Sequence, residues 1–249
     1  MVDVPYLVQH SDDRATTTTE WLRSRHSFSF GDHYDPANTH HGMLLAVNDE
    51  TVSAGQGFDT HPHRETEIVT WVLDGSLVHQ DSAGHSGVVY PSLAQRMSAG
   101  TGVEHSERND TWPARPESGQ TPVRFIQMWL MPDEYGRAPS YDQADVEAEL
   151  AGGALIPIAS GVKTVDSAIR IANASSTLYA ARLPVGGRIT VPTTRFTMAL
   201  VTRGDVVFDD VGLRAGDAVR GADVGGEAIT STSDAEVLIW SMNRALGEP

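Results

Sequence analysis

The chain contains no cysteine among its 249 residues. This absence excludes disulfide bonds, thiolate catalysis, cysteine-ligated zinc and iron–sulfur clusters. No hydrophobic run approaches the roughly 20 residues that a membrane-spanning helix needs. The first residues also lack the basic and hydrophobic regions of a signal peptide. These absences predict a cytoplasmic protein without a membrane anchor.

Positive charge is also scarce. The sequence has 18 Lys and Arg against 33 Asp and Glu, which gives a formal net charge of −15. Proteins that bind nucleic acid or anionic membranes rely on Lys and Arg to neutralise phosphates. The composition therefore argues against direct binding to nucleic acid and against membrane binding. It is compatible with a bound cation.

Short strand-like segments separated by Gly, Asp or Pro fill the sequence, and hydrophobic residues make up 40% of it. With few helix signals, this pattern is typical of a β-sandwich or β-barrel. Ten segments are predicted as strands: 43–47, 67–73, 76–81, 94–99, 123–131, 154–160, 177–183, 196–201, 205–210 and 236–242.

One helix candidate, SYDQADVEAEL, spans residues 140–150, with Ser140 or Asp142 as its N-cap. It follows the linker-like stretch MPDEYGRAPS. We place the domain boundary there, which predicts an N-terminal domain over residues 1–140 and a C-terminal domain over residues 141–249.

The two halves of the sequence resemble each other weakly. The segment WVLDGSLVHQD (71–81) aligns with LVTRGDVVFDD (200–210), with Gly75 over Gly204. The later segments RFIQMWLM and EVLIWSM are also alike. This favours two copies of one β unit, although strand–Gly–strand patterns are common enough to match by chance.

The histidines are distributed unevenly between the halves. All ten lie at or before position 105, and the alignment puts Thr190 and Pro192 opposite His61 and His63. If the fold is duplicated, only the first copy carries the polar cluster.

Two short pairs of polar residues have the spacing of metal ligands. Residues i and i+2 of a strand point to the same face, so His61 and His63 project together, about 6–7 Å apart. His105 and Glu107 repeat the same spacing. Imidazole with carboxylate suits iron, manganese, nickel, copper or zinc. Pro62 cannot donate a ladder hydrogen bond, which favours an edge strand or a barrel mouth.

Other readings of these residues stay open. Glu67 shares the parity of His61 and His63, so it is a carboxylate beside the metal, an unused side chain, or an alternative ligand to Glu107. Proton transfer without metal, by His105 with Glu107, is a further alternative. No Gly-x-Ser-x-Gly elbow and no P-loop supplies another chemistry.

The remaining histidines have no partner at ligand-like spacing. A lone histidine is more often a surface or hydrogen-bonded residue than a metal ligand. We therefore predict structural or surface roles for His10, His26, His33, His40, His41, His79 and His85.

Three longer motifs closely resemble the pirin family of the cupin superfamily. They are WLRSRHSFSFGDHYDP (21–36), GQGFDTHPHRETEIVTWVLDGSLVHQDSAG (55–84) and MSAGTGVEHSERN (97–109). The similarity is nearest to the shorter bacterial pirin-like proteins. It is continuous over residues 20–132 and weak beyond residue 150.

The resemblance implies an all-β bicupin, that is, two jelly-roll β-barrel domains with few short helices. It implies one divalent metal ion in the N-terminal barrel only, held by His61, His63, His105 and Glu107. The family metal is usually iron, so Fe(II) is expected, and Mn, Ni, Cu or Zn would fit the same ligands. General cupins often take the carboxylate that matches Glu67, whereas the pirin pattern uses the one at Glu107.

The resemblance also implies a function. Some pirin-like proteins are described as quercetin 2,3-dioxygenases, so we expect a metal-dependent dioxygenase that acts on a flavonol such as quercetin or a similar enolic aromatic compound. Glu107 is the expected catalytic residue, since it can accept the substrate's proton beside the metal. The protein would bind the small aromatic substrate and dioxygen, and we expect it to be a monomer. The alternative is a non-enzymatic, redox-sensing metal protein that binds a protein partner.

Overall fold

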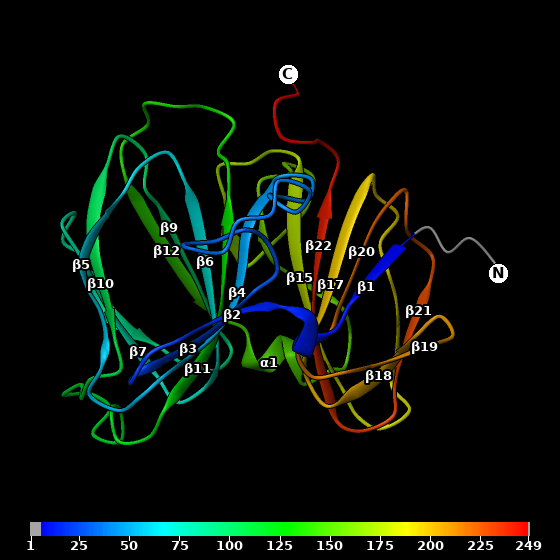
Figure 1. Ribbon diagram of the computed structural model, residues 1–249, viewed down its shortest axis with the longest axis horizontal. Coiled ribbons are helices and arrows are strands. Elements are labelled where there is room, and N and C mark those ends of the chain that lie inside the picture. Colours follow the sequence, from blue (N-terminus) through cyan, green and yellow to red (C-terminus); the bar gives the residue numbers. More distant parts are fainter. Residues whose placement is uncertain (1–5, 249) are drawn as a thin grey trace.

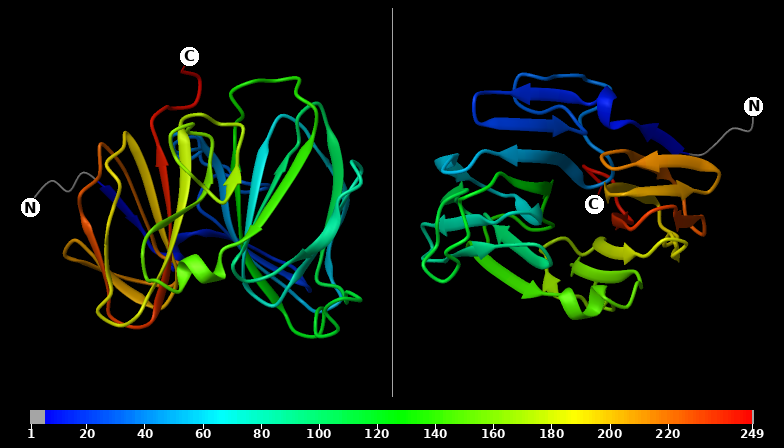
Figure 2. Two further views of the ribbon diagram at one scale, coloured as in Figure 1. Left: turned by 180° about the vertical axis from the view of Figure 1, so that it is seen from behind. Right: turned by 90° about the horizontal axis from the view of Figure 1, so that it is seen from below.

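Two β-barrels lie side by side in the computed structural model, which describes residues 6–248 (Figure 1). In each barrel a seven-stranded sheet and a four-stranded sheet make up the wall. The views from behind and from below show the two barrels in contact along one side (Figure 2). The fold confirms the prediction of an all-β bicupin. Among the described residues, no helix is long and apolar enough to cross a membrane.

The N-terminal barrel has the sheet orders β12-β9-β6-β11-β4-β3-β2 and β5-β10-β7-β8. Its strands are β2 (Ala15–Thr18), β3 (Leu22–His26), β4 (Leu44–Val52), β5 (Gly57–His63), β6 (Glu67–Asp74), β7 (Leu77–Asp81), β8 (Ser86–Val89), β9 (Leu93–Ser98), β10 (Val103–Arg108), β11 (Val123–Leu130) and β12 (Ser140–Asp145).

The C-terminal barrel has the orders β1-β20-β17-β22-β15-β13-β14 and β16-β21-β18-β19. Its strands are β1 (Tyr6–Gln9), β13 (Ile156–Ser160), β14 (Ile169–Arg170), β15 (Ser176–Leu183), β16 (Arg188–Thr190), β17 (Phe196–Arg203), β18 (Asp205–Phe208), β19 (Val211–Arg214), β20 (Ala218–Ala222), β21 (Ala228–Ser231) and β22 (Ala235–Met242). A 3₁₀ turn, η1 (Ser11–Asp13), and one short helix, α1 (Glu147–Leu150), complete the described elements.

The two seven-stranded sheets are buried on both faces. In β6, Ile68 and Val72 belong to clusters inside the N-terminal barrel, whereas Val69 and Trp71 belong to a core shared with the C-terminal barrel. Such strands read as nearly continuous hydrophobic runs, because neither face meets water. This explains eight of the ten predicted strands; the other two, 76–81 and 205–210, correspond to β7 and β18 of the smaller sheets.

Two tryptophans hold the barrels together at this shared core. Trp71 and Trp240 are among the largest fully buried side chains. The indole Nε1 of Trp71 donates to Glu236 at 2.9 Å, and that of Trp240 donates to the sulfur of Met128 at 3.1 Å. Each indole therefore combines a large buried apolar area with one satisfied polar atom that faces the other barrel.

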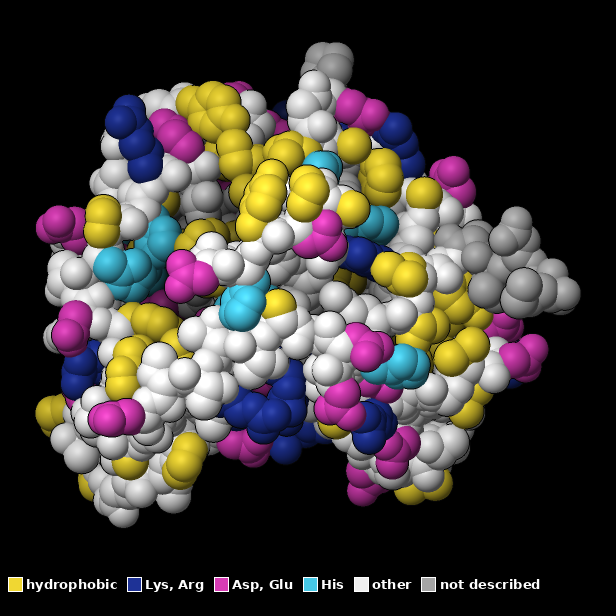
Figure 3. Space-filling view, in the orientation of Figure 1, with side chains coloured by type: hydrophobic (Ala, Val, Ile, Leu, Met, Phe, Trp, Pro, Cys, Tyr) yellow, Lys and Arg dark blue, Asp and Glu magenta, His cyan; other side chains and the backbone are white. Residues whose placement is uncertain are grey.

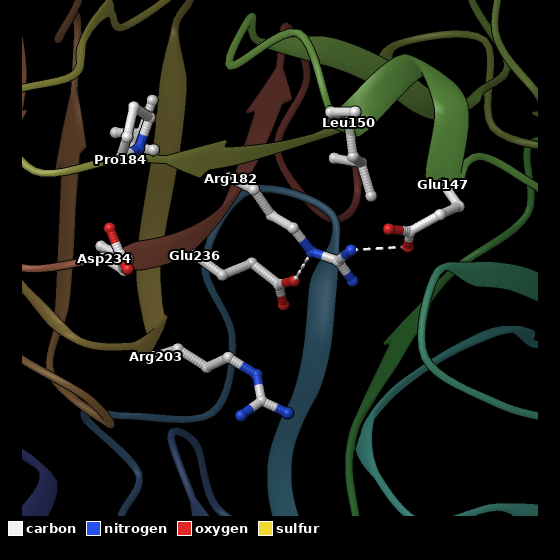
Figure 4. A pocket seen from close by; sticks show the side chains of 10 residues that line it. Glu147, Leu150, Arg182, Pro184, Arg203, Asp234 and Glu236 are labelled. Atoms are coloured by element: carbon white, nitrogen blue, oxygen red, sulfur yellow. Dashed lines mark hydrogen bonds and ion pairs between the residues drawn. The ribbon is translucent and has the colours of Figure 1, made fainter.

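The buried carboxylate of Glu236 organises the polar end of the same interface. It accepts hydrogen bonds from Trp71, from Arg182 at 2.8 Å and from Thr202 at 3.0 Å. Arg182 reaches on to Glu147 at the start of α1, beside a cavity of about 290 Å³ (Figure 4). The guanidinium and the carboxylates are thus paired, which makes this cluster a structural contact between the barrels.

The helix predicted over residues 140–150 is mostly wrong. Ser140–Asp145 forms β12, paired with β9, and only Glu147–Leu150 is helical. Pairing with an open sheet edge satisfies the backbone of this segment, and that outweighs a helical tendency over so short a stretch.

The strand pairing also bears on the predicted domain boundary at residue 140. Strand β12 follows that boundary but lies in the N-terminal sheet, while β1 begins the described chain but pairs with β20 in the C-terminal sheet. Each large sheet therefore carries at one edge a strand from the other side of the boundary.

The internal repeat is visible in the structure. The hairpins β6–β7 and β17–β18 turn at Gly75 and Gly204, and both glycines have positive φ angles, 75° and 68°. The smaller sheets also match in order, with β16 in the place of β5. Thr190 on β16 therefore occupies a strand equivalent to the one that carries His61.

The turn at Gly204 gives a stability prediction. A Cβ at Gly204 would lie 2.1 Å from the carbonyl oxygen of Asp234, whereas a Cβ at Gly186, with a similar φ of 78°, would meet nothing within 4 Å. We expect Gly186→Ala to cost about 1 kcal/mol from the left-handed conformation alone. Gly204→Ala should lower the free energy of unfolding by at least about 2 kcal/mol more, because the backbone at Asp234 must also move. Urea denaturation measures both losses. Equal losses would contradict the tight packing of the β17–β18 turn.

Candidate metal centre

The pairing of β5 with β10 brings the predicted histidines together. His61 lies directly opposite His105 in the antiparallel register. The ring centroids of His61 and His63 are 4.9 Å apart, those of His61 and His105 4.5 Å, and those of His63 and His105 4.9 Å. The three rings thus form a compact triangle. Strand β5 is at the edge of its sheet, as Pro62 predicts.

Hydrogen bonding fixes which nitrogen of His61 faces the triangle. Its Nδ1 lies 2.8 Å from the carbonyl oxygen of Asp59, which only accepts, so Nδ1 carries the proton. The neutral ring then presents a lone pair at Nε2. That nitrogen lies 3.1 Å from Nε2 of His105. Two imidazole nitrogens that converge in this way favour a proton or a metal cation between them.

Burial favours the neutral form of two of these imidazoles, His63 and His105. Burial, and then the neighbouring His105 and His61, lower the pKa of His63 to about 4. Burial also lowers the pKa of His105 below its usual value. Neutral imidazole is the form that binds metal, so protons do not compete strongly for these nitrogens at pH 7.

The cluster is open on one side. His105 is buried, whereas His61 and His63 are only partly buried. Histidine side chains reach the surface of the N-terminal barrel over the sheet that contains β5 and β10 (Figure 3). Part of the His61 and His63 side chains is therefore accessible from solvent.

Glu107 lies inside the barrel next to His105, held by a chain of hydrogen bonds. Gln127 on β11 donates its amide nitrogen to the carboxylate at 2.7 Å, and Trp129 donates its indole nitrogen to the Gln127 oxygen at 3.0 Å. An indole can only donate, so it fixes the orientation of the Gln127 amide. Glu107 is consequently a hydrogen-bond acceptor in a set position.

The carboxylate of Glu107 does not join the three-histidine triangle directly. One ligand atom each from His61, His63 and His105 lies within 4.8 Å of the others, and a second such group consists of His79, His105 and Glu107. His105 belongs to both groups. The four predicted ligands are therefore gathered in one region, with Glu107 connected to the rest through His105.

His79 is the residue of this region that sequence reasoning missed. We predicted a structural or surface role, but the side chain is buried and lies directly opposite Glu107 in the β7–β10 register. The signal was the alternation in LVHQD, which puts His79 and Asp81 on one strand face. Its meaning depends on the long-range pairing of β7 with β10.

Glu67 faces away from the histidines. Its carboxylate accepts hydrogen bonds from the Ser98 hydroxyl at 2.8 Å and from the backbone N–H of Ala172 in the C-terminal barrel at 2.9 Å. It shares a strand face with Trp71 at the interface between barrels. Of the readings left open for Glu67, the structure favours neither an alternative ligand nor a carboxylate beside a metal.

The other histidines have structural or surface positions, as predicted. Among residues 6–248, none of them belongs to a group that could hold a metal ion. His26 is buried and hydrogen-bonds Asn48, His41 contacts the Thr197 carbonyl, and His40 is exposed. The rest are His10, which contacts Asp217, His33, which packs beside His26, and His85, which contacts Asp81.

Aromatic rings surround the triangle. Trp129 packs edge-on against His63 with centroids 4.9 Å apart, and Phe58 lies 6.3 Å from His61. Phe30 packs on Trp129 at 5.2 Å. A planar apolar ligand would find complementary surfaces here.

A second acid is buried in the same barrel. Glu50 on β4 is only 4% exposed and receives a hydrogen bond from Ser24 at 3.1 Å. Burial, and then the charge of Glu107, raise the pKa of Glu50 to about 8. Glu50 is therefore protonated at neutral pH.

Two cupin-type barrels with a histidine cluster in only one of them define a bicupin with a single candidate metal centre. Comparison with known proteins agrees with this class. The Pirin family model matches residues 9–130. A Mycobacterium tuberculosis protein, provisionally named as a quercetin 2,3-dioxygenase, is 50% identical over 97% of this chain and 96% of its own length. The chain belongs to the pirin family.

Two further matches, both from Escherichia coli, extend the comparison. The quercetin 2,3-dioxygenase of strain K12 is 40% identical over 57% of this chain and 58% of its own length. The crystal structure of the bacterial pirin YhhW in complex with nickel(II) is 31% identical, with a TM-score of 0.84 over 96% of this chain and 100% of that chain. The likeness therefore includes the divergent C-terminal barrel.

The protonation of Glu50 predicts a pH-dependent stability. The folded pKa is about 8 against 4.5 for the free side chain, so folding takes up a proton between these values. Stability from this group is full below pH 4.5 and falls as pH rises towards 8. Glu50→Gln removes that loss, so it should raise the melting temperature more at pH 9 than at pH 5. The corresponding difference in the free energy of unfolding should be of order 1–3 kcal/mol. The same shift at both pH values would show that Glu50 is already ionised when folded.

Proposed function

We propose that this protein is a metal-dependent dioxygenase of the pirin type whose substrate is a flavonol such as quercetin or a similar enolic aromatic compound. The observation that carries the proposal is the convergence of three imidazoles inside one barrel, with a carboxylate in a set position beside one of them. The names of the relatives point the same way, since one is a quercetin 2,3-dioxygenase and another a nickel(II) complex.

The side chains fit a divalent ion. His61, His63 and His105 would hold it through ring nitrogens, and Glu107 would add a carboxylate oxygen. The 3.1 Å approach of the His61 and His105 nitrogens supports this assignment, because two lone pairs so close repel unless a cation lies near them. We propose Fe(II) as the ion in the cell, and the same donors accept Mn, Ni, Cu or Zn.

When bound, the metal supplies Lewis acidity and redox chemistry. Glu107 accepts the proton of the enolic hydroxyl, and its hydrogen bond from Gln127 keeps the carboxylate aimed while it does so. Trp129 and Phe58 contact the planar rings of the substrate and exclude water from the reacting face. The acidic hydroxyl of the substrate and the basic carboxylate of Glu107 would thus lie close together.

The proposal first predicts that oxygen consumption with quercetin requires a bound metal and the histidine triangle. Protein reconstituted anaerobically with Fe(II), and separately with Mn, Ni, Cu and Zn, should consume oxygen with quercetin over many turnovers for at least one ion. His61→Ala should abolish turnover, because it removes a ligand nitrogen. His40→Ala, at an exposed histidine, should leave the rate unchanged. Measurement is by oxygen electrode with product analysis.

The outcome also decides between the two functional alternatives. A tightly bound metal without turnover for any ion would contradict the dioxygenase and favour the redox-sensing role. In that case the two oxidation states should differ in affinity for a protein partner.

The role of Glu107 gives a second prediction. Glu107→Gln keeps an oxygen donor but removes the proton acceptor, so flavonol turnover should fall by about 10²–10⁴-fold. Metal occupancy, measured by mass spectrometry of the purified protein, should fall far less. Equal losses of turnover and occupancy would show that Glu107 acts only as a ligand.

A further inference from the structure

Two buried nitrogens in the N-terminal barrel remain unsatisfied. Within residues 6–248, Nδ1 of His79 and Nδ1 of His105 are buried and have no hydrogen-bond partner. A buried polar atom without a partner is unfavourable, so a native protein seldom keeps two of them in neighbouring rings without a reason. The ring centroids of His79 and His105 are 5.3 Å apart, a separation at which one nitrogen of each ring can share a hydrogen bond.

Asp81 sets the protonation of the His79 ring. Its carboxylate accepts the backbone N–H groups of Ala83 at 2.9 Å and His85 at 3.0 Å, within the turn between β7 and β8. The Nε2 atom of His79 lies 3.2 Å from the same carboxylate and therefore donates to it. A neutral imidazole with a proton on Nε2 has a lone pair on Nδ1. In that tautomer the free nitrogen of His79 is an acceptor.

His105 offers the matching donor. Its Nε2 faces His61, which makes Nε2 the nitrogen available to a metal ion. A neutral imidazole that binds metal through Nε2 carries its proton on Nδ1. With a metal ion on Nε2, His105 would carry a buried N–H at Nδ1, in the ring that neighbours His79.

We propose that His79, anchored by Asp81, is a positioning residue of the metal centre: it accepts a hydrogen bond from Nδ1–H of His105 and so orients the His105 ring. The inference rests on the proposed metal-binding role of His61, His63 and His105. Ligating histidines usually donate their second N–H to a carboxylate, carbonyl or water. Here a second histidine stands between the ligand and the carboxylate.

The strand register explains why this arrangement is rigid. His105 is opposite Asp81 and Glu107 is opposite His79 in the β7–β10 pair, with His61 opposite His105 on the other side. Tyr141 on β12 covers His79 with ring centroids 5.0 Å apart. Asp81, His79 and His105 therefore lie on two neighbouring strands, β7 and β10, and β12 shields them.

Three substitutions of His79 distinguish the role of its acceptor, Nδ1, from that of its donor, Nε2–H. His79→Phe removes both and should weaken Ni(II) binding by about 10–100-fold in a chelator competition. His79→Asn puts a carbonyl oxygen where Nδ1 stood and should keep most of the affinity. His79→Gln restores a donor towards Asp81 without that acceptor and should bind as weakly as His79→Phe. Melting temperatures of the metal-free variants check that each one folds.

The matched control is His85→Ala. His85 contacts the same Asp81 carboxylate at 3.0 Å from the outer side, but it does not reach the candidate ligands. Its removal should leave Ni(II) affinity within about twofold of the parent protein. The Cu(II) electron paramagnetic resonance spectrum should likewise change in His79→Phe and stay the same in His85→Ala, because only His79 orients a ligand ring.

Two results would overturn the positioning role. One is equal Ni(II) affinity and an unchanged Cu(II) spectrum in His79→Phe. The other is four coordinated imidazoles, instead of three, in pulsed resonance of the Cu(II)-loaded parent, which would make His79 a ligand. Failure of the metal site itself is distinct: the parent protein would then bind no Ni(II), or His61→Ala would bind it equally well.

Discussion

Strand β10 pairs with β5 on one side and with β7 on the other, and the candidate centre depends on this double pairing. A strand in the middle of a sheet presents its inward side chains to both neighbours at once. His105 thereby meets His61 across one ladder and Asp81 across the other. Moving β10 by one residue would turn His105 and Glu107 out of the barrel together.

The large sheet of the same barrel separates two kinds of chemistry. Its inner face carries Gln127 and Glu50 towards the candidate centre, while its outer face carries Trp71 and Glu67 into the contact with the C-terminal barrel. The two faces of one sheet thus serve different tasks. The glutamate used by many cupins near the metal is, in this chain, part of the contact between domains.

Much of this arrangement could be predicted from the sequence, since strands buried on both faces give strong hydrophobic signals. The i, i+2 spacing of His61 with His63, and of His105 with Glu107, was enough to place each pair on one face. What the spacing leaves open is set by pairing between distant strands. The position of His79 opposite Glu107, and of Glu67 away from both, follows from register, which local pattern does not encode. The segment after Ser140 was misjudged for the same reason, because its partner β9 lies far back in the sequence.

The exchange of edge strands between the barrels has a consequence for how the molecule behaves as a unit. The first barrel borrows β12 from beyond the linker, and the second borrows β1 from the start of the described chain. Neither barrel is a contiguous module that evolution or an experimenter can excise at residue 140. Each half alone would expose an unpaired strand edge, which could pair with other chains and cause self-association. The barrel without the histidine cluster is therefore tied through exchanged edge strands to the barrel that carries the candidate centre.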